Sequence, residues 1–379
     1  MIVIAQICSR CISDDSIPGI SFDSRGVCNY CKIHDNFDKE YPTGDQGQKI
    51  LQEIANKIKY QGRNKKYDCI IGVSGGCDSS FTLYLAKKLG LRPLAVHFDN
   101  TWNSNIATQN IHKVLKKLDV ELYTYVVNNE EYDDIYRSFL KAGVKDIDIP
   151  TDIGLATTLH KAAETYEIKY ILDGHSFRTE GIVPTDFVYM DAKYIESVQN
   201  KFGTRKLETF PNLWMKDQLK WMLFLRIKRI RPLYYIDYQK EEAKKMLSLE
   251  FGWQWYGGHH MENRFTIFAV NYFYPKRFNV DFRKIEFSGL IRSEQMNREI
   301  ALEEIQKPPT IDNEIIQLVK KRLRLTDEEF DTIMNQPKKT YRDYKTYKHT
   351  FERFWWFFWS MYKMNLVSKS FYMKYTKKD

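Results

Sequence analysis

A stretch of small residues early in the chain has the types and the spacing that bind anions. Residues 67–80 read YDCIIGVSGGCDSS, in which the apolar run 68–73 predicts a strand buried on both faces. The pattern from Asp78 to Gly90 predicts a helix. Backbone N–H groups of the loop then face the positive end of the helix dipole, which suits a phosphate group. Ser74 and Ser79 would add hydroxyl donors, and Asp78 would hold a Mg²⁺ ion between phosphate oxygens.

The same segment admits two other interpretations. Residues 72–76 fit the G-x-S-x-G elbow of serine hydrolases, with Ser74 as nucleophile, although the chain offers no clean HGGG-type oxyanion segment. A glycine turn before a helix can also be a turn without a ligand. The Walker A pattern G-x-x-x-x-G-K-S/T is absent, so the loop is not an ordinary P-loop.

Two C-x-x-C pairs with 16 residues between them stand near the N-terminus, at Cys8, Cys11, Cys28 and Cys31. Four thiolates can close a tetrahedron around Zn²⁺, and the hairpin between the pairs is too small to fold on a core of its own. With cysteine at all four positions no coordination site stays open, so we expect a structural metal. The alternatives are disulfides, free thiols and a redox or iron–sulfur role. A cytoplasmic location makes disulfides unfavourable, because the cytoplasm keeps thiols reduced.

Strands expected at 94–99, 121–127 and 170–173 alternate with helices expected at 104–117, 129–142 and 152–167. This alternation indicates βαβ units and an α/β fold with a doubly wound parallel sheet. Ligands of such sheets bind at the carboxyl ends of the strands. Polar residues expected at those ends are Asp99, Asn100, Asp173, Gly174, His175, Arg178 and Glu180; a solvated loop is the alternative for the residues after 172.

The second half of the chain is aromatic and basic. Residues 211–231 are expected to form one amphipathic helix that ends before Pro232. A Gly-Gly pair at 257–258 is followed by polar side chains that suit substrate binding or ordinary surface charge: His259, His260, Glu262, Arg264 and Arg283. Adjacent histidines do not face the same way, so a metal is not expected there. Aromatic residues recur at helical spacing in 338–379, which favours a packed helix over a partner-binding helix or a membrane-interface anchor.

Length, charge and hydropathy set the broad class. The chain has 379 residues and a formal charge of +9, with 12 Lys/Arg against 5 Asp/Glu in 201–245. Nucleotides, anionic sugars, nucleic acid or an acidic membrane surface could each use this charge. No signal peptide and no membrane-spanning run is visible, so we expect a cytoplasmic protein without a transmembrane span. We divide the chain into a four-cysteine zinc module (1–41), a linker helix (42–66), a nucleotide domain (67–200), a helical substrate-binding region (201–335) and a tail helix (336–379).

SGGCDSS resembles the S-G-G-x-D-S signature of the PP-loop ATP pyrophosphatases, in which this loop grips the pyrophosphate of ATP. Together with the double cysteine pair, DGHSFRTEGIVP and GWQWYGG…ENRFT, it resembles the N-acetyl sugar amidotransferases of bacterial lipopolysaccharide and flagellin glycan synthesis, including acetamidino modification of pseudaminic or legionaminic acid. The resemblance covers about residues 5–305. The chain departs from it at His259, where that family is expected to have Lys.

The resemblance implies an ATP-dependent reaction that turns the acetamido group of a sugar, free or nucleotide-activated, into an acetamidino group. ATP, Mg²⁺ and Zn²⁺ are the implied cofactors. Ser74, Gly75, Gly76, Asp78, Ser79 and Ser80 would hold the pyrophosphate and its metal, and Asp99, Gly174 and His175 would line the nucleotide site. Asp78, Ser74, Arg178 and Glu180 are the implied catalytic residues, and His259, Glu262, Arg264 and Arg283 the sugar contacts.

The ammonia source is expected outside this chain. Residue 2 is Ile, so there is no N-terminal Cys nucleophile, and no G-x-C-x-G elbow is present. The resemblance implies a separate glutaminase subunit, with a barrel-type subunit as a possible ammonia conduit, and no nucleic-acid partner. A PP-loop tRNA-modifying enzyme, a serine hydrolase and a non-enzymatic zinc adaptor are the competing hypotheses.

Overall fold

The computed structural model describes residues 6–185, 187–258, 261–364, 366–367 and 369–376. Its centre is a five-stranded sheet in the order β3-β2-β1-β4-β5, in which every neighbouring pair is parallel. The predicted doubly wound sheet is therefore confirmed. The chain order reverses between β1 and β4, and at such a switch point open α/β sheets bind their ligands. The strands are β1 (Cys69–Gly72), β2 (Pro93–Asp99), β3 (Leu122–Val126), β4 (Tyr170–Leu172) and β5 (Lys228–Ile230).

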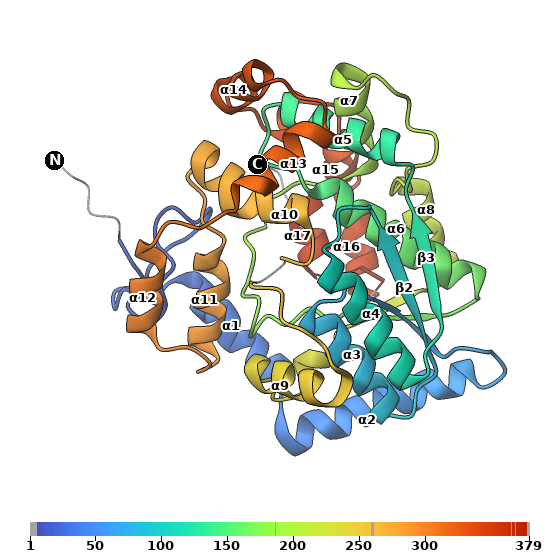
Figure 1. Cartoon of the computed structure of the whole chain (residues 1–379). Helices are drawn as coiled ribbons and strands as arrows, with labels where there is room; N and C mark the ends of the chain where they lie inside the picture. Colours follow the sequence, from blue (N-terminus) through green and yellow to red (C-terminus); the bar gives the residue numbers. More distant parts are fainter. Residues whose placement is uncertain (1–5, 186, 259–260, 365, 368, 377–379) are drawn as a thin grey trace.

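Helices cover both faces of the sheet (Figure 1). Cys69 and Ile71 of β1 face one side and Ile70 the other, because side chains alternate along a strand. Burial on both sides explains why the strand reads as a continuous apolar run. The first face packs against α2 (Gly44–Gly62), α3 (Cys77–Lys88), α4 (Asn105–Leu118) and α9 (Lys240–Phe251), and the second against α6 (Ile149–Thr165).

The largest core joins the carboxyl-terminal helices to the rim of the sheet. Its members include Phe139, Tyr194, Phe268, Phe330 and Phe358, all buried. The helices that contribute to this core include α5 (Asn129–Lys141), α7 (Ala192–Phe202), α10 (Arg264–Phe268), the π-helix η3 (Ala269–Phe278), α13 (Asn313–Arg322), α14 (Asp327–Asn335), α15 (Lys348–Arg353), α16 (Trp355–Lys363) and α17 (Lys369–Thr376). The 3-10 turn η4 (Tyr341–Asp343) packs against it through the partly buried Tyr341. The predicted helical carboxyl-terminal part is therefore confirmed.

A second group of helices gathers at the amino-terminal segment. α1 (Asn29–Glu40) begins directly after Cys28 and contains Cys31, and α11 (Arg283–Arg292) and α12 (Arg298–Gln306) lie beside it on the left of Figure 1. Buried Ile285 of α11 shares a small core with the four cysteines. Segments at opposite ends of the chain therefore form one unit.

The single helix expected over 211–231 is wrong. The structure has α8 (Met215–Leu219), a π-turn η1 (Lys220–Phe224), the fifth strand and a 3-10 turn η2 (Pro232–Tyr235). Arg226 takes a left-handed backbone with φ of 52°, which ends the helical path and lets the chain join β4 as an edge strand. The sheet thus extends beyond the boundary that we expected at residue 200.

The tail is also broken into shorter helices rather than continuous. Phe354 ends α15 and begins α16 with φ −102° and ψ 29°, outside the helical region. Phe358 is buried as expected and Met361 is buried beside it in the same helix, whereas Trp355, Trp356 and Trp359 are exposed. Within the described residues, no helix is long and apolar enough to cross a membrane.

Candidate active site at the PP-loop

The loop between β1 and α3 leaves its backbone open. Gly75 has φ of +82°, and a Cβ atom there would lie 2.1 Å from the carbonyl oxygen of Ala107. Only glycine fits, so the chain passes close under α4. Gly76 is the N-cap of α3 and, as a glycine, has no side chain that could cap this helix. The first turn of α3 therefore presents backbone N–H groups at the positive end of the helix, where an anion can bind.

Ser74 and Ser79 face each other inside the loop. Their hydroxyl oxygens are 3.4 Å apart, the Gly76 N–H donates to Ser74 Oγ at 3.2 Å, and Ser79 Oγ–H donates to the Gly76 carbonyl at 3.2 Å. Ser80 is buried within α3. Among the described residues no histidine bonds to Ser74: the nearest along the sheet, His97, uses Nδ1 on the Val73 carbonyl at 2.8 Å and Nε2 on Asn103 at 3.1 Å. This arrangement disfavours the serine hydrolase.

Asp78 stands in the first turn of α3 with two partners that sequence reasoning missed. The Tyr238 hydroxyl donates to its Oδ1 at 2.5 Å, and Lys240 Nζ lies 4.0 Å from its Oδ2. Lys240 also lies 3.6 Å from Glu286 of α11. Burial alone would lower the pKa of Lys240, but the carboxylates of Asp78 and Glu286 raise it above its ordinary value. The charged side-chain amino group of Lys240 therefore lies buried beside Asp78, the expected Mg²⁺ ligand.

Residues 253–258 and 261–262 form a roof over the loop. Trp253 Nε1–H donates to the Gly75 carbonyl at 2.9 Å, and Asn110 of α4 binds the same carbonyl at 3.3 Å. A Cβ atom on Gly76 would lie 3.2 Å from the Tyr256 hydroxyl and 3.4 Å from Glu262 Oε1. The structure therefore brings the predicted Glu262 to the loop, and the missing side chain of Gly76 makes room for it.

The nucleotide-site candidates stand at the carboxyl edge of the sheet, after β2 and after β4. A Cβ on Gly174 would lie 3.1 Å from the backbone of Asp78 and of Ser79, so the turn after β4 touches the first turn of α3. His175 Nδ1 and the Tyr234 hydroxyl share a hydrogen bond of 3.0 Å, and His175 Nε2 lies 3.9 Å from the Glu180 carboxylate. Asp99 ends β2 and accepts from the Thr101 N–H at 2.8 Å.

Asp173 precedes this turn and faces two arginines. Arg229 belongs to β5, and Arg231 follows directly after that strand. Asp173 Oδ2 is 3.7 Å from Arg229 and 3.4 Å from Arg231. Burial raises the pKa of Asp173, but these two guanidinium groups outweigh burial and hold it below its ordinary value. A carboxylate and two cations therefore line the edge next to Gly174.

Three predicted arginines have different surroundings. Arg178 is buried and donates to Asp38, to the Tyr41 carbonyl and to the Tyr234 carbonyl at 2.8–3.0 Å, so it ties the amino-terminal segment to the sheet. Arg264 begins α10, and its backbone N–H donates to the Trp102 carbonyl at 2.8 Å. Arg283 begins α11 and binds Asp281 and the carbonyls of Glu304 and Lys307. The bonds of Arg178 and Arg283 thus lead away from the loop, and His259 lies outside the described residues.

The four predicted cysteines converge into one buried cluster. Their Sγ atoms are 3.8 Å apart for Cys8 and Cys31, 3.8 Å for Cys11 and Cys28, and 3.6 Å for Cys28 and Cys31. All four are free thiols, since a disulfide needs about 2.05 Å between sulfurs. Four sulfur atoms at these distances could together bind a single metal ion.

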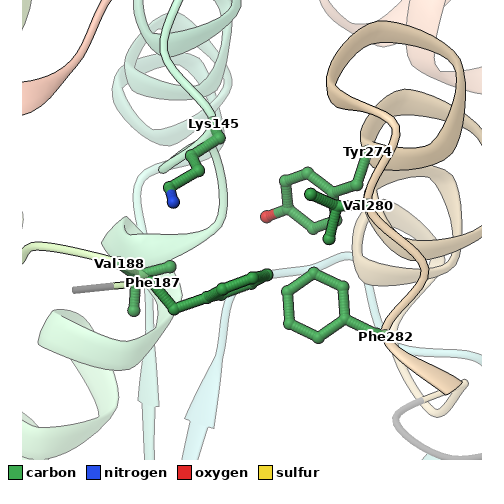
Figure 2. A pocket seen from close by; sticks show the side chains of 6 residues that line it. All are labelled: Lys145, Phe187, Val188, Tyr274, Val280 and Phe282. Atoms are coloured by element: carbon green, nitrogen blue, oxygen red, sulfur yellow. The ribbon is translucent and has the colours of Figure 1, made fainter. Parts of the chain in front are cut away.

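A small hollow lies elsewhere, between the segments 145, 187–188 and 274–282. Figure 2 shows Lys145, Phe187 and Val188 on one side and Tyr274, Val280 and Phe282 on the other. Five of the six lining side chains are apolar or aromatic, and none belongs to the loop or to its roof. We therefore place the candidate site at the loop, where the polar groups converge.

Sequence comparison adds a family to this geometry. Residues 262–362 match the family described as LPS biosynthesis protein WbpG-like, C-terminal domain. The matched segment begins at Glu262, which lies over Gly76, and includes Glu286 beside Lys240. The matched segment thus supplies Glu262 to the loop and Glu286 to Lys240.

Individual relatives cover different parts of the chain. An uncharacterized protein of Methanocaldococcus jannaschii is 25% identical over 323 residues, which are 83% of this chain and 98% of that protein. The tRNA-specific 2-thiouridylase MnmA of Proteus mirabilis is 31% identical over 134 residues, 31% of this chain and 36% of the enzyme, so the chain matches about a third of that relative's length.

Among solved structures, the NMN synthetase from Francisella tularensis aligns with a TM-score of 0.33 and 15% identity, over 75% of this chain and 95% of that chain. The resemblance found in the motifs is borne out by the family match. Residues 262–362 are thus similar to the C-terminal domain of the WbpG-like lipopolysaccharide biosynthesis proteins.

Proposed function

We propose that this chain is the synthetase component of an ATP-dependent amidotransferase that converts the acetamido group of a sugar, or of a nucleotide-activated sugar, into an acetamidino group. The observation that carries the proposal is the amino terminus of α3 with its glycine N-cap, with Asp78 and Lys240 beside it and the segment matched to the WbpG-like domain reaching over it at Glu262. The site thus combines an anion cradle with groups from a surface-glycan biosynthesis domain.

The reaction needs activation because an amide oxygen is a poor leaving group. The acetamido oxygen attacks the α-phosphorus of ATP and pyrophosphate departs. Ammonia then adds to the activated carbon, and AMP leaves with the former amide oxygen. The products are the acetamidino sugar, AMP and pyrophosphate, so nitrogen replaces oxygen without any redox step.

The residues of the chain fit the phosphate part of this reaction. The loop amides and the hydroxyls of Ser74 and Ser79 bind and orient the pyrophosphate, and Lys240 offsets charge that develops on it. Asp78 would hold Mg²⁺, which supplies charge neutralisation between phosphate oxygens when bound. Tyr238 orients Asp78, because its hydroxyl donates to the carboxylate.

The remaining candidates would hold the substrates. Asp99, Gly174 and His175 stand at the sheet edge where the nucleotide would lie, with Glu180 beside His175. Glu262 and Arg264 enter from the WbpG-like domain and are proposed to contact the sugar. In this structure Arg178 is bound to Asp38, so its proposed effect on catalysis is through the fold of the sheet edge.

The four-cysteine cluster is proposed to hold Zn²⁺. A regular tetrahedron with Zn–S bonds of about 2.3 Å has sulfur–sulfur edges of about 3.8 Å. The observed edges of 3.6–3.8 Å agree with this size. In a four-iron cluster each cysteine binds a different iron, and in a two-iron cluster the four cysteines are divided between two irons, so cysteine sulfurs on different irons would lie further apart. The spacing therefore favours one ion with a closed, structural coordination sphere.

Ammonia is proposed to come from a separate glutaminase subunit, because the sequence lacks the nucleophile that hydrolyses glutamine. The purified chain should therefore use ammonium salts and should show little activity with glutamine alone. Full glutamine-dependent activity from the isolated chain would contradict the two-component assignment.

The direct test supplies ATP, Mg²⁺ and ammonium salt with a panel of nucleotide-linked N-acetyl sugars. AMP is followed by chromatography, and replacement of O by NH in the sugar by high-resolution mass spectrometry. Asp78→Ala should abolish AMP formation. Asp45→Ala is the matched control, because Asp45 also lies in the first turn of a helix but is exposed on α2. AMP formation by the Asp78 variant would overturn its assignment to Mg²⁺.

A tRNA-modifying enzyme is the second candidate, favoured by the local similarity to 2-thiouridylases and by the basic stretch 201–245. It predicts AMP release on addition of tRNA and binding that weakens steeply with salt, because phosphate contacts release counterions. AMP formation with tRNA but with none of the sugars would select this candidate.

A further inference from the structure

Helix α11 connects the cysteine cluster to the PP-loop. Its last residue, Arg292, is 6% exposed and lies on the thiols. Nε donates toward Cys31 Sγ at 3.3 Å, and Nη2 lies 3.2 Å from Cys11 Sγ and 3.2 Å from Ser13 Oγ. A guanidinium group that contacts several thiolates offsets the net negative charge of a divalent ion bound by four of them.

Further bonds hold α11 and α12 on the same cluster. The hydroxyls of Ser288 and Ser13 are 3.0 Å apart, although the residues are separated by 275 positions. Arg298 at the start of α12 donates to the carbonyls of Cys8 at 2.9 Å and Cys11 at 3.1 Å. The cluster and this pair of helices therefore form one body, which Figure 1 shows at the left of the molecule.

The other side of this body faces the loop. Glu286 of α11 lies 3.6 Å from Lys240 Nζ. Gln295, just after α11, donates from Nε2 to the Tyr238 carbonyl at 3.0 Å and accepts the Lys240 N–H on Oε1 at 3.0 Å. Tyr238 and Lys240 both reach the Asp78 carboxylate with their side chains. An unbroken series of contacts therefore runs from the thiols to the expected phosphate site.

We propose that Arg292 is a positioning residue for the PP-loop: it fixes α11 on the cysteine cluster and thereby sets Tyr238 and Lys240 at Asp78. Without Arg292 the buried thiolates lack their counter-charge and α11 loses its attachment, so Gln295 and Glu286 no longer hold the 238–240 segment. The cysteine module then acts on nucleotide binding from outside the nucleotide site. This inference rests on the proposed use of ATP at the loop.

The experiment compares Arg292→Met with Arg277→Met in the full chain. Arg277 is 5% exposed, so the two arginines are matched in burial, but the guanidinium of Arg277 donates to the carbonyls of Met334, Gln336 and Pro337 and not to the cysteine cluster. Binding of Mg·ATP is measured by calorimetry, and the Co²⁺-substituted cluster is followed by its thiolate charge-transfer absorption. We expect Arg292→Met to weaken ATP binding about tenfold and to shift the absorption, and Arg277→Met to do neither.

A second variant keeps the test decisive if Arg292→Met does not fold. Gln295→Leu cuts the contact with Tyr238 and Lys240 but leaves the cluster intact, so ATP binding should weaken while the Co²⁺ absorption stays unchanged. Arg292→Lys, which keeps the charge, should restore part of the ATP affinity. Unchanged ATP affinity in Arg292→Met, or in Gln295→Leu where the first variant is unfolded, would overturn the inference. Absence of ATP binding by the unmodified chain would instead overturn the proposed function.

Discussion

At the scale of single residues, the loop depends on a glycine that no other residue replaces. Gly75→Ala should destabilise the fold by about 3 kcal/mol, because the new Cβ meets the Ala107 carbonyl in a left-handed backbone. Gly44→Ala is the matched control: its φ is +64° but nothing lies within 4 Å of the Cβ, so it should cost about 1 kcal/mol. Urea unfolding of both variants measures the difference, and equal losses would show that the close approach does not matter.

Asp146 gives a pH-dependent prediction, because its burial raises its pKa from 3.8 to about 6. The folded state then binds the proton more tightly than the unfolded state, so this group stabilises the fold below about pH 4 and that stability is lost as pH rises through about 6. Asp146→Asn should therefore raise the free energy of unfolding by up to about 3 kcal/mol at pH 7 and change little near pH 4.

Unfolding of Asp146→Asn and of the unmodified chain is compared at each pH, so that groups common to both cancel in the difference. The partners of Asp146, the Tyr194 hydroxyl and the Tyr189 N–H, stay in place in both chains. A difference between the chains that does not vary with pH would contradict the raised pKa.

The residues around Asp78 show what a single sequence reveals and what it does not. The loop was predictable because its glycines, serines and aspartate are adjacent and each has a local conformational reason. Tyr238 was missed because it lies 160 positions from Asp78 and nothing in its own neighbourhood marks it. Lys240, a basic residue at the start of a helix, resembles a surface residue until the fold buries it.

At the scale of elements, α16 offers two aromatic residues on opposite sides of one short helix. Phe358 is 3% exposed in the main core and Trp356 is 57% exposed. Phe358→Ala should therefore lower the free energy of unfolding by about 3–5 kcal/mol, and Trp356→Ala should change it by less than about 0.5 kcal/mol. Denaturant titration of the two variants checks this, and a large loss in the Trp356 variant would contradict the exposed position.

Helix and strand predictions succeeded where one period dominated a segment. The run 68–73 and the helices before residue 167 each have a single apolar pattern and a clear stop. Residues 211–231 failed because the amphipathic pattern continues past Arg226, whose left-handed backbone the sequence does not signal. An edge strand of three residues, partly exposed, has too little burial to leave a pattern of its own.

At the scale of the whole molecule, the cysteine cluster should stabilise other parts of the chain in addition to the segment that contains it. Cys11→Ser should abolish the bound metal and lower the free energy of unfolding by about 3–5 kcal/mol, because Arg292 is left as a buried charge without its thiolates. Cys69→Ala is the matched control, a buried cysteine of β1 outside the cluster, and should keep one metal ion per chain. Metal content by mass spectrometry separates the two variants.

Hydrogen exchange after loss of the metal shows whether the cysteine module is structurally coupled to α11, α12 and the PP-loop. If the cluster were an isolated module, hydrogen exchange in Cys11→Ser would rise only before residue 41. Because α11 and α12 bond to Ser13 and to the carbonyls of Cys8 and Cys11, exchange should also rise in 283–306. It should rise further in 236–240, which Gln295 holds. Unchanged exchange in both segments would show that the module folds independently of the PP-loop.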